Sequence, residues 1–193
     1  MIPAERRAIP WLVDFAAQRG LHYEPDADER WLRVWEPFAT LRVPIRYEHT
    51  LQSTGSVGSL TLARFVVPGP QGYEASAWIA IAQDIRIDAP AAATCDLGGV
   101  FGEPLDLVPM PRQATRDPAF DATFATFAAT PEEAARALTP SLRRLVMTWR
   151  TPLHIETRRG GFILAPVALP ADPPSLSWLL RAIQLFGEKA TKR

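Results

Sequence analysis

Asparagine is absent from this 193-residue chain, cysteine occurs once and lysine occurs twice. The single cysteine, Cys95, excludes an intramolecular disulfide and any zinc or iron–sulfur site that is built from several cysteines. No stretch of about 18 residues is apolar throughout, so the sequence predicts no transmembrane helix. The first residues also lack the apolar core of a signal peptide. These absences favour a soluble, cytoplasmic protein.

The rest of the composition is that of an ordinary globular domain, with 47% hydrophobic and 22% charged residues. Basic and acidic residues both number 21, so the net charge is zero and gives no strong signal for nucleic acid. The two signs are unevenly spread, because residues 1–130 hold 11 basic and 16 acidic residues, whereas residues 131–193 hold 10 basic and five acidic ones. The arginines of the second part either neutralise the acidic first part across the fold, which we favour, or form a patch for phosphate, nucleic acid or an acidic protein.

The first part of the chain predicts one helix followed by strands. Apolar residues at helical spacing favour a helix near residues 9–20, and residues 21–24 begin a strand. Alternating or β-branched residues between turn signals then predict four strands, at Arg30–Val34, Thr40–Thr50, Ser59–Val67 and Tyr73–Ile87. Their short connections favour antiparallel pairing. Residues 89–118 are rich in proline and glycine, which predicts an irregular loop packed on the body of the domain.

The second part predicts a mixed unit of strands and helices. A strand over 122–128 precedes Thr130-Pro131-Glu132-Glu133, whose cap, proline and glutamate are typical of a helix start. The elements that follow are a helix over 131–149 that kinks or restarts at Pro140, strands at 153–157 and 161–165, and a helix over 175–190. These helices are expected to place in the core Leu145, Trp149, Leu179 and Ile183.

Together these elements predict an α+β fold. It consists mainly of antiparallel β-sheet, with an N-terminal helix, a kinked helix and a C-terminal helix packed on the sheet. We expect a single domain over residues 1–193. The alternative is a subdivision into a β-rich part, 1–118, and a βαββα part, 119–193.

Several short segments carry a resemblance that covers most of the chain. Their order is a helix ending in Arg-Gly before an aromatic strand, a β-rich middle, a Phe-Asp-x-x-Phe segment and a Leu-Thr-Pro helix start. The segments are Ala16-Ala17-Gln18-Arg19-Gly20-Leu21-His22-Tyr23-Glu24, Phe120-Asp121-Ala122-Thr123-Phe124 and Leu138-Thr139-Pro140-Ser141-Leu142, followed by the leucine-rich last helix. In this order the chain resembles conserved hypothetical proteins of bacteria. The resemblance implies the same order of elements, and it supplies no reaction and no active-site residue.

Histidine and cysteine offer two candidate catalytic arrangements. His154 and Glu156 share one face of a predicted strand, as a metal site or an acid–base pair requires. Two ligands are fewer than the three of a catalytic zinc, so we favour a surface cross-strand pair. Cys95 is a candidate nucleophile with His22, His49 or His154 as its base. The carboxylate of the adjacent Asp96 disfavours the thiolate, so a buried, inert Cys95 is the favoured interpretation.

Two glycine-bearing loops and one acidic segment lack the features of ligand sites. Gly55-Ser56-Val57-Gly58-Ser59 and Gly98-Gly99-Val100-Phe101-Gly102 match no phosphate-binding fingerprint, which favours turn glycines. Asp26-Ala27-Asp28-Glu29 lacks the glycine and the distant glutamate of a calcium loop, which favours a solvated turn. The sequence therefore predicts no metal and no cofactor.

Tryptophans and arginines supply the candidate interaction surface. Trp31 and Trp35 alternate with charged neighbours, so one or both are candidates for an exposed binding surface. The arginines belong to the basic second part of the chain. The complete candidate set is Trp31, Trp35, Arg143, Arg144, Arg158 and Arg159.

Three hypotheses for the function stay open. The usual set of nucleophile, base and orienting group is missing, which favours a non-catalytic binding or protein-interaction module. An enzyme of unfamiliar type, whose polar residues converge only in three dimensions, is the first alternative. A structural subunit of a homo-oligomer is the second. The expected partners are accordingly a second copy of the chain or an acidic protein.

Overall fold

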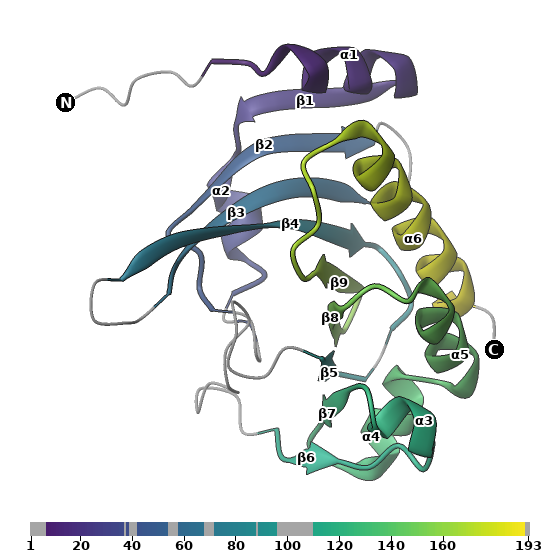
Figure 1. Ribbon diagram of the computed structural model, residues 1–193. Helices are drawn as coiled ribbons and strands as arrows, with labels where there is room; N and C mark the ends of the chain where they lie inside the picture. The colour runs from purple at the N-terminus through teal and green to yellow at the C-terminus, as the bar shows by residue number, and fades with distance from the viewer. Residues whose placement is uncertain are drawn as a thin grey trace.

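The computed structural model describes residues 7–36, 38, 42–53, 58–67, 72–87, 89–95 and 110–191. Within these ranges the chain forms one antiparallel sheet of nine strands, together with six helices (Figure 1). The strands are β1 (Leu21–Asp26), β2 (Arg46–Ser53), β3 (Ser59–Val67), β4 (Tyr73–Gln83), β5 (Ala91–Thr94), β6 (Arg112–Gln113), β7 (Ala125–Phe127), β8 (Leu153–Arg158) and β9 (Gly161–Pro166). The helices are α1 (Pro10–Arg19), α2 (Glu29–Arg33), α3 (Pro118–Asp121), α4 (Pro131–Ala137), α5 (Pro140–Trp149) and α6 (Pro173–Thr191). This architecture confirms the predicted α+β fold with a mainly antiparallel sheet.

The sheet interleaves early and late segments of the chain. Its strand order is β1-β2-β3-β4-β9-β8-β5-β7-β6, and all the pairings between neighbours are antiparallel. The β8–β9 hairpin comes from the second part of the chain and inserts between β4 and β5 of the first part. The two parts that the sequence allowed as separate units therefore share one sheet.

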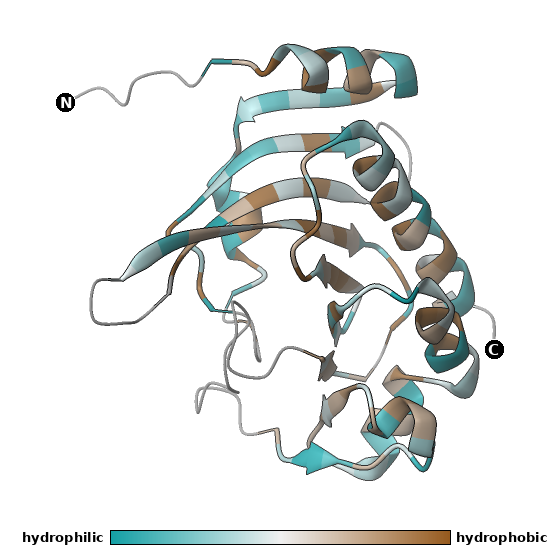
Figure 2. Ribbon diagram, in the orientation of Figure 1, coloured by the Kyte–Doolittle hydropathy of each residue, from teal (hydrophilic) through white to brown (hydrophobic). Residues whose placement is uncertain are grey.

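One face of the sheet carries the larger hydrophobic core, which includes residues of α1, α5 and α6. α6 runs obliquely across this face in Figure 1, and Figure 2 shows apolar residues recurring along it. Leu176, Leu179 and Ile183 of α6 are buried, and the ring of Phe186 lies 4.5 Å from the ring of Phe162 in β9. Burial of such a side chain contributes about 1.5–3 kcal/mol, so this stripe fixes α6 on the sheet.

A smaller core lies on the opposite face of the sheet, against α2. Leu32 of α2 and Trp35 just after it pack there on residues of β3, β4 and β9. β4 serves both cores, because successive side chains of a strand point to opposite faces. Trp78 accordingly belongs to the larger core and Ile79 to the smaller one.

The segment Arg30–Val34 was predicted as a strand, and that prediction is wrong, because helix α2 occupies it. Asp28 caps the helix by accepting a hydrogen bond of 3.0 Å from the backbone N–H of Arg30. Arg33 pairs with Glu29, one helical turn earlier, at 2.9 Å. A cap and a pair of opposite charges four residues apart both favour a helix, and here they outweigh the alternating pattern.

Other predicted elements differ in their bounds. The segment 122–128 holds only the three-residue strand β7, and α3 precedes it. The segment 131–149 restarts at Pro140 rather than kinking there, because α4 ends before Pro140 and α5 begins at it with Thr139 as its cap. The segment 89–118 contains the short strands β5 and β6, while residues 96–109 lie outside the described ranges.

The core positions of the last helix are as predicted, since Leu179 and Ile183 are buried. Those of α5 differ, because Leu145 and Trp149 are only half-buried, whereas the neighbouring stripe of Leu142 and Val146 is buried. Trp149 packs edge-on against Trp178 of α6, with ring centroids 5.9 Å apart. The buried apolar positions of α5 are thus Leu142 and Val146, and Trp149 packs at the edge of the same core.

Candidate functional site

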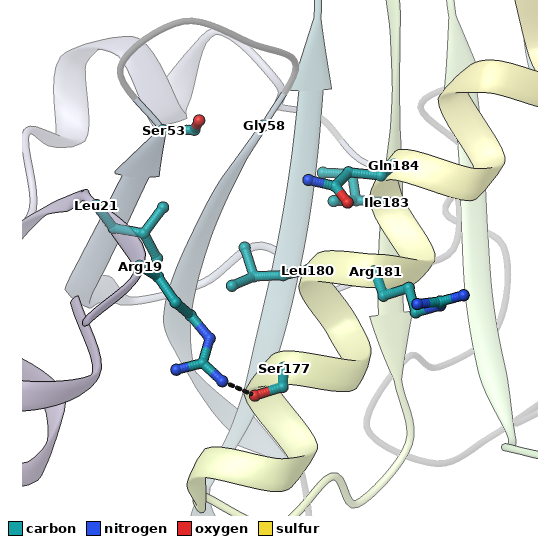
Figure 3. Close-up of a pocket in the computed structure, with 9 residues that line it drawn as sticks. All are labelled: Arg19, Leu21, Ser53, Gly58, Ser177, Leu180, Arg181, Ile183 and Gln184. Atoms are coloured by element: carbon teal, nitrogen blue, oxygen red, sulfur yellow. Dashed lines mark hydrogen bonds between the residues drawn. The ribbon is translucent and has the colours of Figure 1, made fainter. Parts of the chain in front are cut away.

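A groove of about 480 Å³ separates α6 from the corner where α1 meets β1 (Figure 3). Its walls come from the end of α1, the start of β1, the adjoining ends of β2 and β3, and one side of α6. The lining residues are Arg19, Leu21, Ser53, Gly58, Ser177, Leu180, Arg181, Ile183 and Gln184. Its volume falls within the range of about 300–1,000 Å³ that is typical of small-molecule sites.

The sequence of α6 gives this helix a groove-facing side beside its buried side. Ser177, Leu180, Arg181 and Gln184 are spaced three or four residues apart, so they lie on one side of the helix. Ile183 lies at the border, because it is buried in the larger core and also lines the groove. The apolar part of the groove is therefore continuous with the core.

Two glycines shape the opposite walls. Gly20 ends α1 in the left-handed conformation, at φ 62°, so the chain turns at once into β1. Gly58 approaches α6 closely, because a Cβ atom there would lie 2.5 Å from Cδ1 of Ile183. The Arg19-Gly20 pair places the arginine at the mouth of the groove.

The start of α1 is held by a half-buried tyrosine and a histidine. The backbone N–H of Ile9 donates to the Tyr23 hydroxyl at 3.1 Å, and the Tyr23 hydroxyl lies 2.8 Å from Nδ1 of His49. Loss of solvent around Tyr23 raises the pKa of its hydroxyl, although the bond from Ile9 lowers it. The hydroxyl therefore stays protonated and links α1 to β1 and β2.

Arg19 is held in place while most of its donors stay unused. Its guanidinium carbon lies 4.1 Å from the centre of the Phe15 ring, and Nη2 donates to the Ser177 hydroxyl at 2.6 Å. Ser177 in turn donates to the carbonyl of Pro173 at 2.6 Å. A guanidinium has five N–H donors, and only one of those of Arg19 is bonded within the described part of the chain.

The charge of the groove is positive. The two charged residues in its lining are Arg19 and Arg181, and both are exposed. Figure 3 shows Arg19 reaching across to α6, whereas Arg181 extends from α6 on the side away from Arg19. No carboxylate of the described ranges pairs with either arginine. An anion in the groove would therefore meet uncompensated positive charge.

A second cavity, of about 350 Å³, lies where β5 and β8 meet the end of α5. Cys95 lines it together with Phe124, Met147 and Arg150, among others, and the lining contains no histidine. The Cys95 sulfur accepts a hydrogen bond of 2.9 Å from the N–H of Leu153 and donates to the carbonyl of the same residue at 3.3 Å. The thiol is thus part of the contact between β5 and β8. Asp96, its predicted acidic neighbour, lies outside the described residues.

The two candidate tryptophans lie against the smaller core. Trp35 is 7% exposed, and Trp31 is half-buried beside the same core. The guanidinium carbon of Arg158 lies 5.9 Å from the centre of the Trp35 ring and 5.7 Å from that of Phe38. Trp31 therefore retains some exposed surface, whereas Trp35 serves mainly to pack α2 on the sheet.

The four candidate arginines occupy different surroundings. Arg143 is buried, pairs with Asp117 at 3.3 Å and donates to the carbonyl of Leu138 at 2.7 Å. Arg158 pairs with Glu156 at 3.4 Å on the face of the smaller core, whereas α5, which carries Arg143, covers the other face. Arg144 and Arg159 are exposed. The structure therefore separates these arginines between the two faces of the sheet.

The histidine–glutamate pair on β8 is buried rather than at the surface. Nε2 of His154 lies 3.0 Å from Oε1 of Glu156, and the side chains are 0% and 2% exposed. A second pair with the same spacing, His22 and Glu24, lies on β1 at the surface. No group of three potential metal ligands occurs in the part of the chain that the structure describes.

The glycine-bearing and acidic segments have structural surroundings where they are described. Asp28 caps α2, and Glu29 bonds Arg33 and the backbone N–H of Tyr47. Gly58 lines the groove, while 54–57 and 98–102 fall outside the described ranges. None of the helices within those ranges has both the length and the apolar character to cross a bilayer.

No pattern in the sequence indicated the groove. Arg19 and Ser177 bond each other across 158 positions of the chain, and no local pattern links them. The polar stripe of α6 is also what any helix on the surface presents to water. The one local signal was Arg19-Gly20, which the sequence marked as a helix end and not as a site.

No protein-family model matches the chain, and no curated protein matches it in sequence. Among solved structures, the crystal structure of the mycobacterial trehalose monomycolate transport factor A, TtfA, is similar, with a TM-score of 0.55. The match covers 92% of this chain and 90% of that one, at 13% sequence identity. At this identity the likeness shows a shared fold over nearly the whole length of both chains.

Proposed function

We propose that this protein is a non-catalytic binding module whose ligand occupies the groove between α6 and the α1–β1 corner. The observation that carries the proposal is the lining, which combines apolar residues of the core border with an arginine whose donors are largely unused. Concave sites that join an apolar floor to a few fixed polar groups are typical of ligand pockets.

The chemistry of the groove supports binding rather than catalysis. The described residues of its lining include no histidine, carboxylate or thiol, so they supply no general base and no activated nucleophile. Arginine stays protonated at all physiological pH values and acts through charge and hydrogen bonds. Outside the groove, His154 and Glu156 are bonded to each other in the sheet without exposure to solvent.

The similar mycobacterial structure is that of a protein named as a trehalose monomycolate transport factor. That name agrees with the proposed class of function. The identity of 13% leaves the ligand of this chain to be determined from its own residues.

Four octyl compounds with different head groups test the proposal: octanoate, octyl phosphate, octyl glucoside and octyltrimethylammonium, each below its micellar concentration. Backbone amide chemical shifts of the ¹⁵N-labelled chain report binding residue by residue. We expect at least one compound to shift the amides of the groove. Gln184→Trp, which fills the groove, should abolish these shifts, whereas Gln18→Trp, on exposed α1 outside the lining, should preserve them. If none of the four compounds shifts groove amides, the proposed function is wrong.

A further inference from the structure

We infer that the ligand of the groove is an amphiphile with an anionic oxygen head group, a carboxylate or a phosphate monoester, which Arg19 binds. The inference rests on the proposed function and names the class of ligand. It follows from three features of the groove: a guanidinium that is already oriented, an apolar floor next to it, and a positive charge without a counter-ion.

The first feature is the orientation of Arg19. Contact with the Phe15 ring and the bond to Ser177 fix the guanidinium from two sides. Fixing it in advance lowers the entropy that binding would otherwise cost. A planar guanidinium with free N–H groups matches the oxygens of a carboxylate or phosphate, and such charge-assisted hydrogen bonds are about twice as strong as neutral ones.

The second feature is the apolar floor. Leu21 and Leu180 are half-buried, so each leaves part of its side chain in contact with water, and both line the groove with Ile183. Figure 3 shows Leu180 between Arg19 and the Ile183–Gln184 end of the groove. Covering this surface with a ligand tail releases apolar area from water at about 25 cal/mol per Å². A head group at Arg19 would direct the tail towards Leu180.

The third feature is the charge. Arg19 and Arg181 are the charged residues of the lining, and a cationic head group would be repelled there. The uncharged polar residues Ser53 and Gln184 lie in the same lining. None of the described residues that line the groove is aromatic, so they offer no surface on which a nucleotide base could stack. The lining therefore suits an anion with an aliphatic tail better than a nucleic acid.

The octyl series tests the inference through the order of the affinities. Octanoate and octyl phosphate are expected to bind at least about tenfold more tightly than octyl glucoside, and octyltrimethylammonium most weakly. Comparing the two anions identifies the preferred head group. Inorganic phosphate alone is expected to bind far more weakly than octyl phosphate, because it lacks the tail. Equal affinities for phosphate and octyl phosphate would overturn the inference that the ligand is an amphiphile and would indicate a simple anion site.

Variants of the arginines complete the test. Arg19→Gln should remove the preference for the two anions over octyl glucoside, whereas Arg19→Lys should retain part of the preference. Arg181→Gln should have a smaller effect, and Arg144→Gln, an exposed arginine of α5 outside the groove, none. Circular dichroism checks that each variant is folded. If all four head groups bind equally and Gln184→Trp abolishes their binding, the groove is a binding site but the inference about charge is wrong.

Discussion

His154 and Glu156 form a hydrogen-bonded pair, 3.0 Å apart, in which neither side chain has appreciable contact with solvent. The same spacing and the same distance of 3.0 Å recur on β1 between His22 and Glu24, whose side chains are 59% and 34% exposed. The chain thus contains one pair geometry in two different environments. Coulomb interactions and the cost of an unpaired group both grow as water is excluded. The two pairs should therefore contribute differently to the free energy of unfolding.

Glu156→Gln is expected to lower the free energy of unfolding by about 3 kcal/mol, because it removes the charge that Arg158 and His154 face in a buried site. Glu24→Gln is the matched control and should cost about 0.5 kcal/mol or less, as exposed pairs do. Urea denaturation at pH 7 measures both values. Equal losses of free energy of unfolding in the two variants would show that burial does not determine how much these pairs contribute to stability.

Local patterns predicted most of the sheet because its strands carry their own signals. Ser59–Val67 supplies residues to both cores, and the β8–β9 hairpin has a tight turn between two short strands. Ala91–Thr94 lacked such a signal, since alanine is uncommon in strands. It becomes a strand because it is buried between β7 and β8, where small side chains fit. Tertiary contacts alone determine that element.

The segment around Trp31 shows the opposite limitation. Trp31 and Trp35 lie around Leu32 and Val34 among charged neighbours, a pattern that suits a strand, but they are also four residues apart, which places them on one side of a helix. Both periods are present in so short a segment. The cap at Asp28 decides between them, and its signal was weaker in the sequence than the apolar pattern. The groove was still less predictable, because Arg19 and Ser177 meet only in the folded chain.

Asp117 is expected to make stability depend on pH in the acidic range. The backbone N–H of Phe120 and then the guanidinium of Arg143 hold the pKa of this carboxyl below its usual value of about 3.9. A lowered pKa in the folded state contributes stability above the unfolded pKa, and this contribution is lost as the pH falls through the folded value. Asp117→Asn should therefore lower the unfolding temperature at pH 7.

The difference between the wild type and Asp117→Asn should shrink as the pH falls below about 4 and should be lost at lower pH. Asp14→Asn, on the exposed side of α1, serves as the control and should follow the wild type throughout. Thermal melts across this pH range provide the measurement. If the difference in unfolding temperature stays constant with pH, the negative charge of Asp117 does not contribute to stability.

Tyr47 should produce the corresponding effect at alkaline pH. Burial first, and then the hydrogen bond that its hydroxyl donates to Glu36 at 2.8 Å, raise the pKa of Tyr47 well above its usual range. A raised pKa contributes stability that is fully present below the unfolded value of about 10 and is lost as the pH rises further. Tyr47→Phe should cost about 2 kcal/mol at pH 8, because Glu36 loses a donor.

This cost should decrease between pH 10 and 11, where only the wild type has a tyrosine that ionises on unfolding at this position. Free energies of unfolding in urea at pH 8, 10 and 11 would show the trend. The exposed Tyr73 supplies the control, and Tyr73→Phe should change stability little at any of these pH values. If the free energy of unfolding that Tyr47→Phe costs increases above pH 10, the pKa of Tyr47 is not raised in the folded state.

Position 161 requires a glycine, because two neighbouring groups crowd the place that a Cβ atom would occupy. A Cβ atom there would overlap the carbonyl oxygen of Ala82 and lie 2.5 Å from an atom of the Trp35 ring. Gly161→Ala should therefore lower the free energy of unfolding by about 3 kcal/mol, measured in urea. The adjacent Gly160 is the matched control, because nothing lies within 4 Å of its Cβ position and its φ of 85° is the only obstacle to a side chain. Gly160→Ala should cost about 1 kcal/mol.

A second substitution separates the two contacts of Gly161. Trp35→Leu removes the ring atom, but the carbonyl oxygen of Ala82 belongs to the backbone of β4, which pairs with β9 and cannot turn aside. The loss caused by Gly161→Ala should therefore be reduced in the Trp35→Leu background without disappearing. Full recovery would assign the crowding to the Trp35 ring alone, and an equal loss in both backgrounds would assign it to the strand. The partial recovery that we expect would show that the Trp35 ring and the backbone of β4 both require a glycine at the start of β9.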